Sequence, residues 1–221
     1  TWVSEGKLVQ AFEGSLSSRL GLVRPVAVNS GTSALHLALI LSGIGPGDEV
    51  ILPPQTFIAT GLVVLMQRAT PVYADIEANT GNIDPESVRR KISEKTRAII
   101  AVHWGGYPCD MDALNIMAGQ HNLAVIEDAA HALGAVYCGK PVGSLSRFTA
   151  FSFQAIKHVT TGDGGALCCL RDDDHEKCRA MRWFGIDRER SEVSFLGERD
   201  YDVRHIGYKH HMNDLGAAVG L

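Results

Sequence analysis

The chain has 221 residues, of which 45% are hydrophobic and 21% are charged, and its formal net charge is −4. This composition is enough for one large α/β domain with a full core. The negative balance, without a long basic cluster, argues against a nucleic-acid-binding or membrane-surface protein, and no apolar run reaches membrane-spanning length. Five cysteines without a CxxC pair indicate a reducing compartment, so we expect a cytoplasmic protein.

Short apolar runs alternate with helix-length amphipathic segments. The predicted strands are Val26–Val28, Glu49–Leu52, Thr70–Tyr73, Thr96–Val102, Leu123–Glu127, Phe148–Phe153 and Ala166–Leu170. The predicted helices are Thr32–Ser42, Ile58–Arg68, Pro85–Ser93, Met111–His121 and Asp173–Phe184. The strands are rich in Val, Ile and Ala and alternate little, which is typical of strands buried on both faces. We therefore expect an α/β fold with a mostly parallel seven-stranded sheet between helices.

Three other stretches carry weaker predictions. The charged segment Asp187–His205 predicts a long surface loop, a candidate cover for an active site. The chain begins at Thr1 without a methionine and stops within an apolar helical pattern at Leu221. We therefore expect residues 1–221 to be a large domain truncated at both ends.

One lysine stands at the exit of a predicted strand, in the run SFQAIKHVTTGDGG. A partly buried lysine is poorly solvated, so more of it is free amine, which is a nucleophile toward aldehydes. Earlier, the run VIEDAAH puts Asp128 at the end of another apolar strand. A lysine for a Schiff base and a carboxylate for a pyridinium nitrogen are what pyridoxal phosphate (PLP) requires of a protein. Taken alone, Lys157 could be a surface lysine and Asp128 a helix N-cap.

The run VAVNSGTSAL predicts a strand, a tight turn and a helix. Gly31 permits a close approach of the backbone, while Thr32 and Ser33 place hydroxyl and N–H groups at a helix N-terminus. Such a terminus favours an anion, which predicts a phosphate site. The alternative is simple N-capping by Ser and Thr. GxGxxG and Walker patterns are absent, so nothing supports a nucleotide-binding fold.

Further residues could surround a flat cofactor ring. Phe57 follows the second predicted strand and could stack on the ring, or be an ordinary core phenylalanine. Ala130 is small enough to pack on the opposite ring face. His131 could hydrogen-bond a phenolic oxygen or cap the turn. The remaining histidines have no metal-ligand spacing, so we expect no metal site.

At this point a resemblance emerges from motifs in series along the whole chain. The runs NSGTSALHLAL, GDEVILPPQTFIAT, PVYADI, GNIDP, PCDMDAL, IEDAAHALGA, SFQAIKHVTTGDGGAL and GYKHHMNDLGAAVGL resemble the DegT/DnrJ/StrS family of PLP-dependent sugar aminotransferases. The resemblance implies the aspartate-aminotransferase-like fold (PLP fold type I) and a homodimer whose active sites lie at the interface. It also implies nucleotide-linked keto-deoxysugars as substrates, glutamate or glutamine as amino donor, and a small C-terminal domain beyond Leu221.

The resemblance assigns roles residue by residue. It makes Lys157 the imine-forming lysine and Asp128 the partner of the pyridine nitrogen, and it places His131 near the ring oxygen. It makes Phe57 the stacking aromatic. The implied phosphate ligands are Gly31, Thr32, Ser33 and Ser152. Lys209 is a departure, because family members commonly have an asparagine there that reaches the cofactor phosphate of the neighbouring subunit. A lysine could meet that phosphate too.

Three rival functions stay open at this stage. A deoxysugar dehydratase of this family would have histidine in place of Lys157, so that residue argues against it. An aminotransferase for a cyclitol ketone would share every motif above. A non-catalytic regulator on the same fold is disfavoured because both Lys157 and Asp128 are present.

Overall fold

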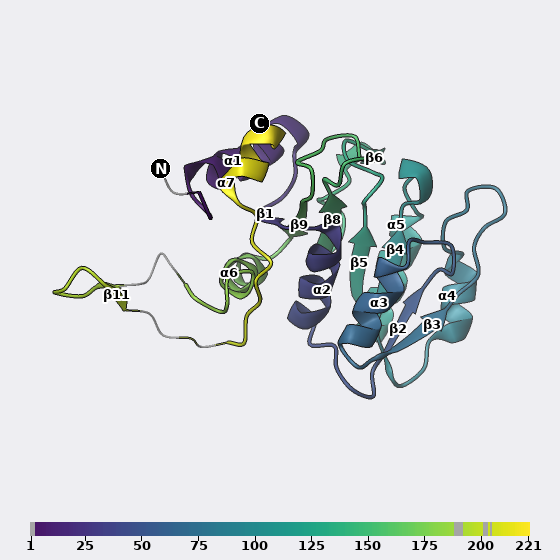
Figure 1. Cartoon of the computed structure of the whole chain (residues 1–221). Helices are drawn as coiled ribbons and strands as arrows, with labels where there is room; N and C mark the ends of the chain where they lie inside the picture. Colours follow the sequence, from purple (N-terminus) through teal and green to yellow (C-terminus); the bar gives the residue numbers. More distant parts are fainter. Residues whose placement is uncertain (1–2, 188–191, 201–202, 204) are drawn as a thin grey trace.

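The computed structural model describes residues 3–187, 192–200, 203 and 205–221. Its centre is a sheet of seven strands in the order β1-β9-β8-β5-β4-β2-β3 (Figure 1). The strands are β1 Pro25–Val28, β2 Glu49–Leu52, β3 Thr70–Tyr73, β4 Thr96–Val102, β5 Ala124–Asp128, β8 Phe148–Ser152 and β9 Gly165–Cys169. Within this sheet β9 runs antiparallel to both neighbours, and the other pairings are parallel. The predicted mostly parallel sheet is confirmed.

Helices cover both faces of the sheet, as Figure 1 shows. They are α1 Lys7–Leu20, α2 Gly31–Leu41, α3 Ala59–Met66, α4 Pro85–Lys91, α5 Met111–His121, α6 Asp172–Met181 and α7 Asp214–Gly220, with a 3-10 turn at Trp104–Gly106. The core on one face joins the sheet to α2, α3 and α6. On the other face, one cluster packs under α1 and α7 and a second under α4 and α5. Adjacent residues of one strand therefore serve different cores.

The predicted strand bounds agree with the structure to within one residue, because each strand is a short apolar run between polar turns. The correction at β5 matters, since Asp128 is its last residue. Helix α6 ends at Met181, three residues before the predicted Phe184. Phe184 has a positive φ of 56° and its N–H donates to the Tyr208 carbonyl, so the chain has already left the helix.

Helix α1 was not predicted. Its buried side chains Val9, Phe12 and Leu16 have helical spacing. Gly14 and three serines weaken that pattern. Its N-terminus is held from outside, because Asp214 in α7 accepts the N–H groups of Gly6 (2.8 Å) and Val9 (3.1 Å). Such a long-range cap leaves no local sequence signal.

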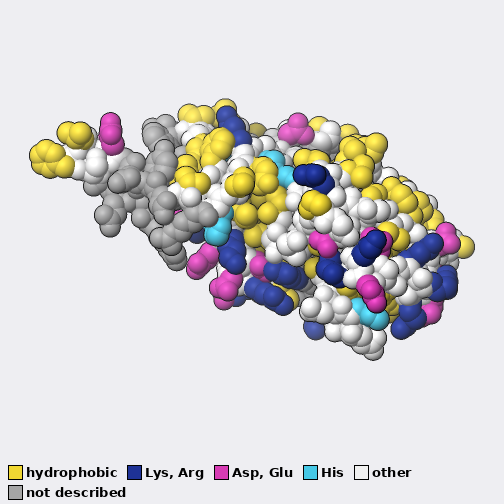
Figure 2. All heavy atoms as spheres, turned by 90° about the horizontal axis from the view of Figure 1, so that it is seen from below, with side chains coloured by type: hydrophobic (Ala, Val, Ile, Leu, Met, Phe, Trp, Pro, Cys, Tyr) yellow, Lys and Arg dark blue, Asp and Glu magenta, His cyan; other side chains and the backbone are white. Residues whose placement is uncertain are grey.

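The predicted surface loop Asp187–His205 contains a short antiparallel hairpin, β10 Glu192–Val193 with β11 Arg199–Asp200. Figure 1 shows this hairpin projecting away from the sheet, so it does not cover the sheet in this chain. Figure 2 shows hydrophobic side chains at its far tip, where Phe195 and Leu196 are exposed. A second small hairpin joins β6 Val136–Tyr137 to β7 Lys140–Pro141. None of the helices in the described residues is long and apolar enough to cross a membrane.

Candidate active site

The carboxyl ends of three neighbouring strands meet at one edge of the sheet. Asp128 ends β5, where it pairs with Val102 of β4 and Ala150 of β8. Ser152 ends β8, and Lys157 lies in the turn that follows. Ligands of open α/β sheets bind beyond such strand ends. The fold therefore gathers at one edge residues that are far apart in the sequence.

The carboxylate of Asp128 is buried, with 7% of the residue exposed. Its Oδ2 accepts the Thr60 hydroxyl at 2.7 Å, and its Oδ1 accepts the Ala130 N–H at 3.3 Å. Thr60 lies in α3 and is itself fully buried, and its hydroxyl is 2.6 Å from that of Thr56. Both carboxylate oxygens are thus oriented by hydrogen-bond donors. Such a carboxylate can bind a protonated ring nitrogen.

His131 connects Asp128 electrostatically to Lys157. Burial lowers the pKa of His131, the positive charge of Lys157 lowers it further, and the Asp128 carboxylate acts in the opposite direction. The three side chains are therefore close enough to influence one another. Lys157 is half-buried, and its backbone N–H donates to the Gln154 carbonyl at 2.9 Å. A neutral imidazole at this place can donate one hydrogen bond and accept another.

The N-terminus of α2 lies against the end of β8. Ser30 caps the helix: its Oγ accepts the Ser33 N–H at 3.1 Å, and its carbonyl accepts the Ala34 N–H at 3.1 Å. The N–H groups of Gly31 and Thr32 precede these bonds and have no place in the helical ladder. A Cβ on Gly31 would lie 3.0 Å from the Ser152 Cβ, so only glycine fits without a shift. The Ser33 hydroxyl is engaged within the chain, because it donates to Asn29 Oδ1 at 2.6 Å. Gly31, Thr32 and Ser152 are therefore the better placed candidates for a phosphate at this helix start.

Phe57 and Lys209 lie at the edges of this arrangement. Phe57 is 74% exposed, which rules out the core alternative, and its carbonyl accepts the Thr60 N–H at 3.1 Å. Lys209 is exposed, and its carbonyl accepts the Asn29 side-chain amide at 3.1 Å. The backbone of Lys209 thus lies beside the start of α2 in its own chain. The expectation that its ammonium serves the neighbouring subunit's phosphate stays a prediction.

Thr60 and Trp104 are site residues that sequence reasoning missed. Trp104 follows β4, and its ring lies edge-on to His131 with 6.2 Å between ring centroids. The backbone N–H of Trp104 donates to Asn82 Oδ1 at 2.9 Å. A Cβ on Gly81 would lie 3.0 Å from the Trp104 ring, so the ring is closely confined. The spacing of Thr56 and Thr60, four apart near a helix start, was the available signal for Thr60.

Similarity to known proteins identifies the family of this chain. Residues 1–221 match the profile of the DegT/DnrJ/EryC1/StrS aminotransferase family. The chain belongs to this family. The predicted resemblance is therefore confirmed, and the structural similarity to sugar aminotransferases confirms PLP fold type I with its seven-stranded, mostly parallel sheet.

Three members of the family, or of its fold, show how close the similarity is. The chain is 44% identical to the spore coat polysaccharide biosynthesis protein SpsC of Bacillus subtilis and 42% identical to the GDP-perosamine synthase of Caulobacter vibrioides. All of this chain is aligned in both cases, and it spans 57% of each relative. The solved structure of Spr1654 from Streptococcus pneumoniae, described as a sugar aminotransferase, is 33% identical. Its PLP form has a TM-score of 0.88, covering 99% of this chain and 59% of that one. A PMP form of the same protein is equally similar in sequence.

Proposed function

We propose that the protein binds PLP and transfers an amino group from glutamate or glutamine to a nucleotide-linked keto-deoxysugar. The observation that carries this proposal is the grouping of Asp128, His131 and Lys157 at one sheet edge, beside the N-terminus of α2. Family membership supports the reaction class. The GDP-perosamine synthase among the relatives supports a nucleotide sugar as substrate.

The residues present fit PLP at each of its polar groups. The N–H groups at the start of α2 that lie outside the helical ladder, together with Thr32 and Ser152, suit the phosphate dianion. The predicted ligand Ser33 fits less well, because its hydroxyl already donates to Asn29. Asp128, with both oxygens oriented by donors, suits the protonated pyridine nitrogen. The exposed ring of Phe57 and the small side chain of Ala130 suit the two faces of a flat ring. When bound, PLP supplies the electron sink that makes a carbon–hydrogen bond next to an amine acidic.

The chain's own residues would then perform distinct tasks. The Nζ of Lys157 holds the cofactor covalently, and once released it accepts the proton from the donor's α-carbon and returns it as a general acid. The Asp128 carboxylate keeps the ring nitrogen protonated. His131 meets the ring oxygen as a neutral imidazole, since burial and Lys157 both lower its pKa. Lys157 also argues against the dehydratase alternative.

The same proposal includes a homodimer with shared active sites, because Lys209 is expected to reach a neighbouring subunit. The exposed Phe57 lies at the entrance of the site, where a partner or substrate would cover it. Assays of the complete protein with keto sugars and cyclitol ketones would separate the sugar substrate from its cyclitol alternative.

Borohydride reduction tests the cofactor attachment directly. We expect peptide mass spectrometry of the reduced protein to place a pyridoxyl group on Lys157. Lys140, which is exposed in β7, serves as an internal control and should stay unmodified. A Lys157→Ala variant should lose the label altogether. A label on Lys140, or on no lysine of a PLP-containing protein, would refute the proposal.

A further inference from the structure

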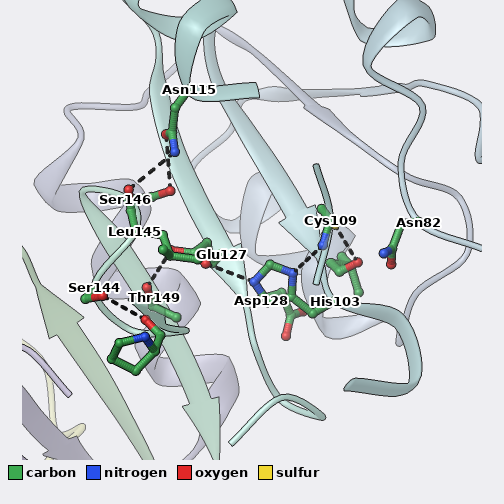
Figure 3. A network of polar contacts seen from close by, with 12 residues as sticks. Asn82, His103, Cys109, Asn115, Glu127, Asp128, Ser144, Leu145, Ser146 and Thr149 are labelled. Carbon is green, nitrogen blue, oxygen red and sulfur yellow. Dashed lines mark hydrogen bonds and ion pairs between the residues drawn. The ribbon is translucent and has the colours of Figure 1, made fainter. Parts of the chain in front are cut away.

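A chain of polar side chains is completely buried behind the strand that carries Asp128. Glu127 has no exposed surface and His103 is 1% exposed. The Oε2 atom of Glu127 lies 2.9 Å from His103 Nε2, and its Oε1 accepts the Thr149 hydroxyl at 2.8 Å. Figure 3 shows Glu127 between these two partners, with Asp128 next to it. None of the roles proposed above uses this network.

The two acidic residues at the end of β5 point to opposite faces of the sheet. Asp128 meets Thr60 of α3, on the face covered by α2, α3 and α6. Glu127 lies on the face covered by α4 and α5, with Cys109 and its neighbours. His103 contacts both, because its backbone N–H donates to the Asp128 carbonyl at 3.1 Å. The Cα atoms of consecutive residues are only about 3.8 Å apart.

The hydrogen bonds define the charge of this network. The Cys109 N–H donates to His103 Nδ1 at 3.1 Å, so this nitrogen carries a lone pair and the ring is neutral. The proton of the ring is therefore on Nε2, where it is donated to Glu127. The carboxylate then accepts from His103 on one oxygen and from Thr149 on the other. A carboxyl group that accepts hydrogen bonds on both of its oxygens, and donates none, is ionised.

Within the part of the chain that the structure describes, no lysine or arginine forms an ion pair with this carboxylate. Among the described residues, the only basic side chain within ion-pair distance of Glu127 is His103, which is neutral. A buried charge without a counter-charge costs free energy even when it is hydrogen-bonded. Asp174, which is also buried, contrasts with Glu127 because Arg147 binds it through two nitrogens at 2.8 and 2.9 Å. A positive charge that compensates Glu127 would therefore have to come from outside the described residues.

We propose that Glu127 is a second negative charge for the cofactor ring, acting from behind the sheet through the end of β5. It rests on the proposed function, since the compensating positive charge is the protonated pyridine nitrogen that Asp128 would bind directly. Glu127 does not touch the ring. It would act through the buried end of β5, where charges interact more strongly than in water. His103 holds the carboxylate and the Asp128 backbone in a fixed relation.

Glu127→Gln removes the charge and keeps the shape. In the complete protein freed of cofactor, we expect the melting temperature to rise by about 2–4 °C, because an uncompensated buried charge is gone. The dissociation constant for PLP should rise about tenfold, because the ring loses a charge partner. If the charge serves the cofactor, Glu127→Gln should thus raise the stability of the cofactor-free protein and lower its affinity for PLP. A purely structural role predicts lower stability and unchanged affinity.

Two variants control this experiment. Glu127→Asp retains the charge and should bind PLP within about threefold of the parent, although its hydrogen bonds are strained. Asp174→Asn removes another buried carboxylate, one that has its own arginine, so it should lower stability and leave PLP affinity unchanged.

The outcomes separate the inference from the function on which it rests. Unchanged PLP affinity in Glu127→Gln would overturn the inference. Weaker binding together with lower cofactor-free stability, or failure of this variant to fold, would also overturn it, because the charge would then be structural. A parent protein that binds no PLP would overturn the proposed function and the inference together.

Discussion

The two faces of β5 present contrasting versions of one arrangement, a carboxylate held by a hydroxyl at the end of a strand. On the α3 face, Thr60 and a backbone N–H bind Asp128, which lies at the carboxyl end of β5. On the α5 face, His103 and Thr149 bind Glu127 in a sealed core. Asp128 is thus placed to meet a ligand on one face, whereas Glu127 is shielded from any ligand on the other. Direct contact with a ligand, and not burial, should decide how strongly each carboxylate affects turnover and cofactor affinity.

Replacement of Asp128 by asparagine should have the largest effect. The substitution keeps the shape but removes the charge that holds the ring nitrogen protonated, so turnover should fall about a hundredfold or more. Steady-state kinetics of the complete protein would measure it, with circular dichroism to verify the fold. Turnover should fall less in Glu127→Gln, because Glu127 would influence the ring without contacting it. Near-normal transamination would contradict the role of Asp128.

The buried histidines extend the comparison between the faces. On the α2 face, Gln67 donates its amide N–H to His36 Nε2 at 2.6 Å, and His36 Nδ1 lies 3.2 Å from His210 Nε2. Here a histidine again accepts an N–H, but it has no carboxylate partner. Burial, and then the neighbouring His210, lower the pKa of His36 to about 4. Protonation of this ring would oppose both the burial and the hydrogen bond from Gln67.

Acidification should therefore lower the free energy of unfolding through His36, which is buried in α2. Because the folded pKa of His36 lies below the unfolded value of 6.5, the unfolded chain takes up the proton first as the pH falls. The stability is complete above about pH 6.5 and is lost progressively toward pH 4, by about 3 kcal/mol from this group. Urea unfolding at several pH values would measure it. A His36→Gln variant with the same acid loss would show that other groups cause it.

The sequence predicted well what depends on local order. Apolar runs located β5 and β8, so Asp128 and Lys157 could be placed at strand ends. It could not indicate that Thr60 reaches Asp128 across 68 positions, because this contact depends on α3 packing over the sheet. Glu127 lay inside a run read as apolar, and no periodicity shows that His103 stands opposite. Contacts between elements depend on the order of the strands in the sheet, and short sequence motifs do not determine that order.

Loss of the Lys209 side chain should have an intermediate effect on the accessible face. A charge-assisted hydrogen bond to phosphate contributes about 1.5–3 kcal/mol, so Lys209→Ala should weaken PLP binding about ten- to a hundredfold. A titration of cofactor-free protein would measure this. Homodimers that hold PLP as tightly as the parent would show that Lys209 is only a surface charge.

Mixed dimers would show which subunit Lys209 serves. A dimer of one Lys157→Ala subunit and one Lys209→Ala subunit places both lesions at one site if the lysine reaches across, so the other site stays active. If Lys209 serves its own subunit, whose α2 its backbone adjoins through Asn29, both sites are damaged.

The smallest effect should come from Thr60, which contacts Asp128 and not the cofactor. Thr60→Val keeps the volume of this fully buried side chain but removes the hydroxyl that orients Oδ2. Stability should fall by about 1–3 kcal/mol, because a buried charge loses a donor. PLP affinity should fall by less than about tenfold, because the charge itself remains. Thr60→Ser restores the donor and should restore affinity, whereas Thr56→Val, one step further from the carboxylate, should leave it near the parent value. If Thr60→Val lowered turnover as much as Asp128→Asn, orientation and not charge would dominate on the accessible face, and the contrast with Glu127 would lose its basis.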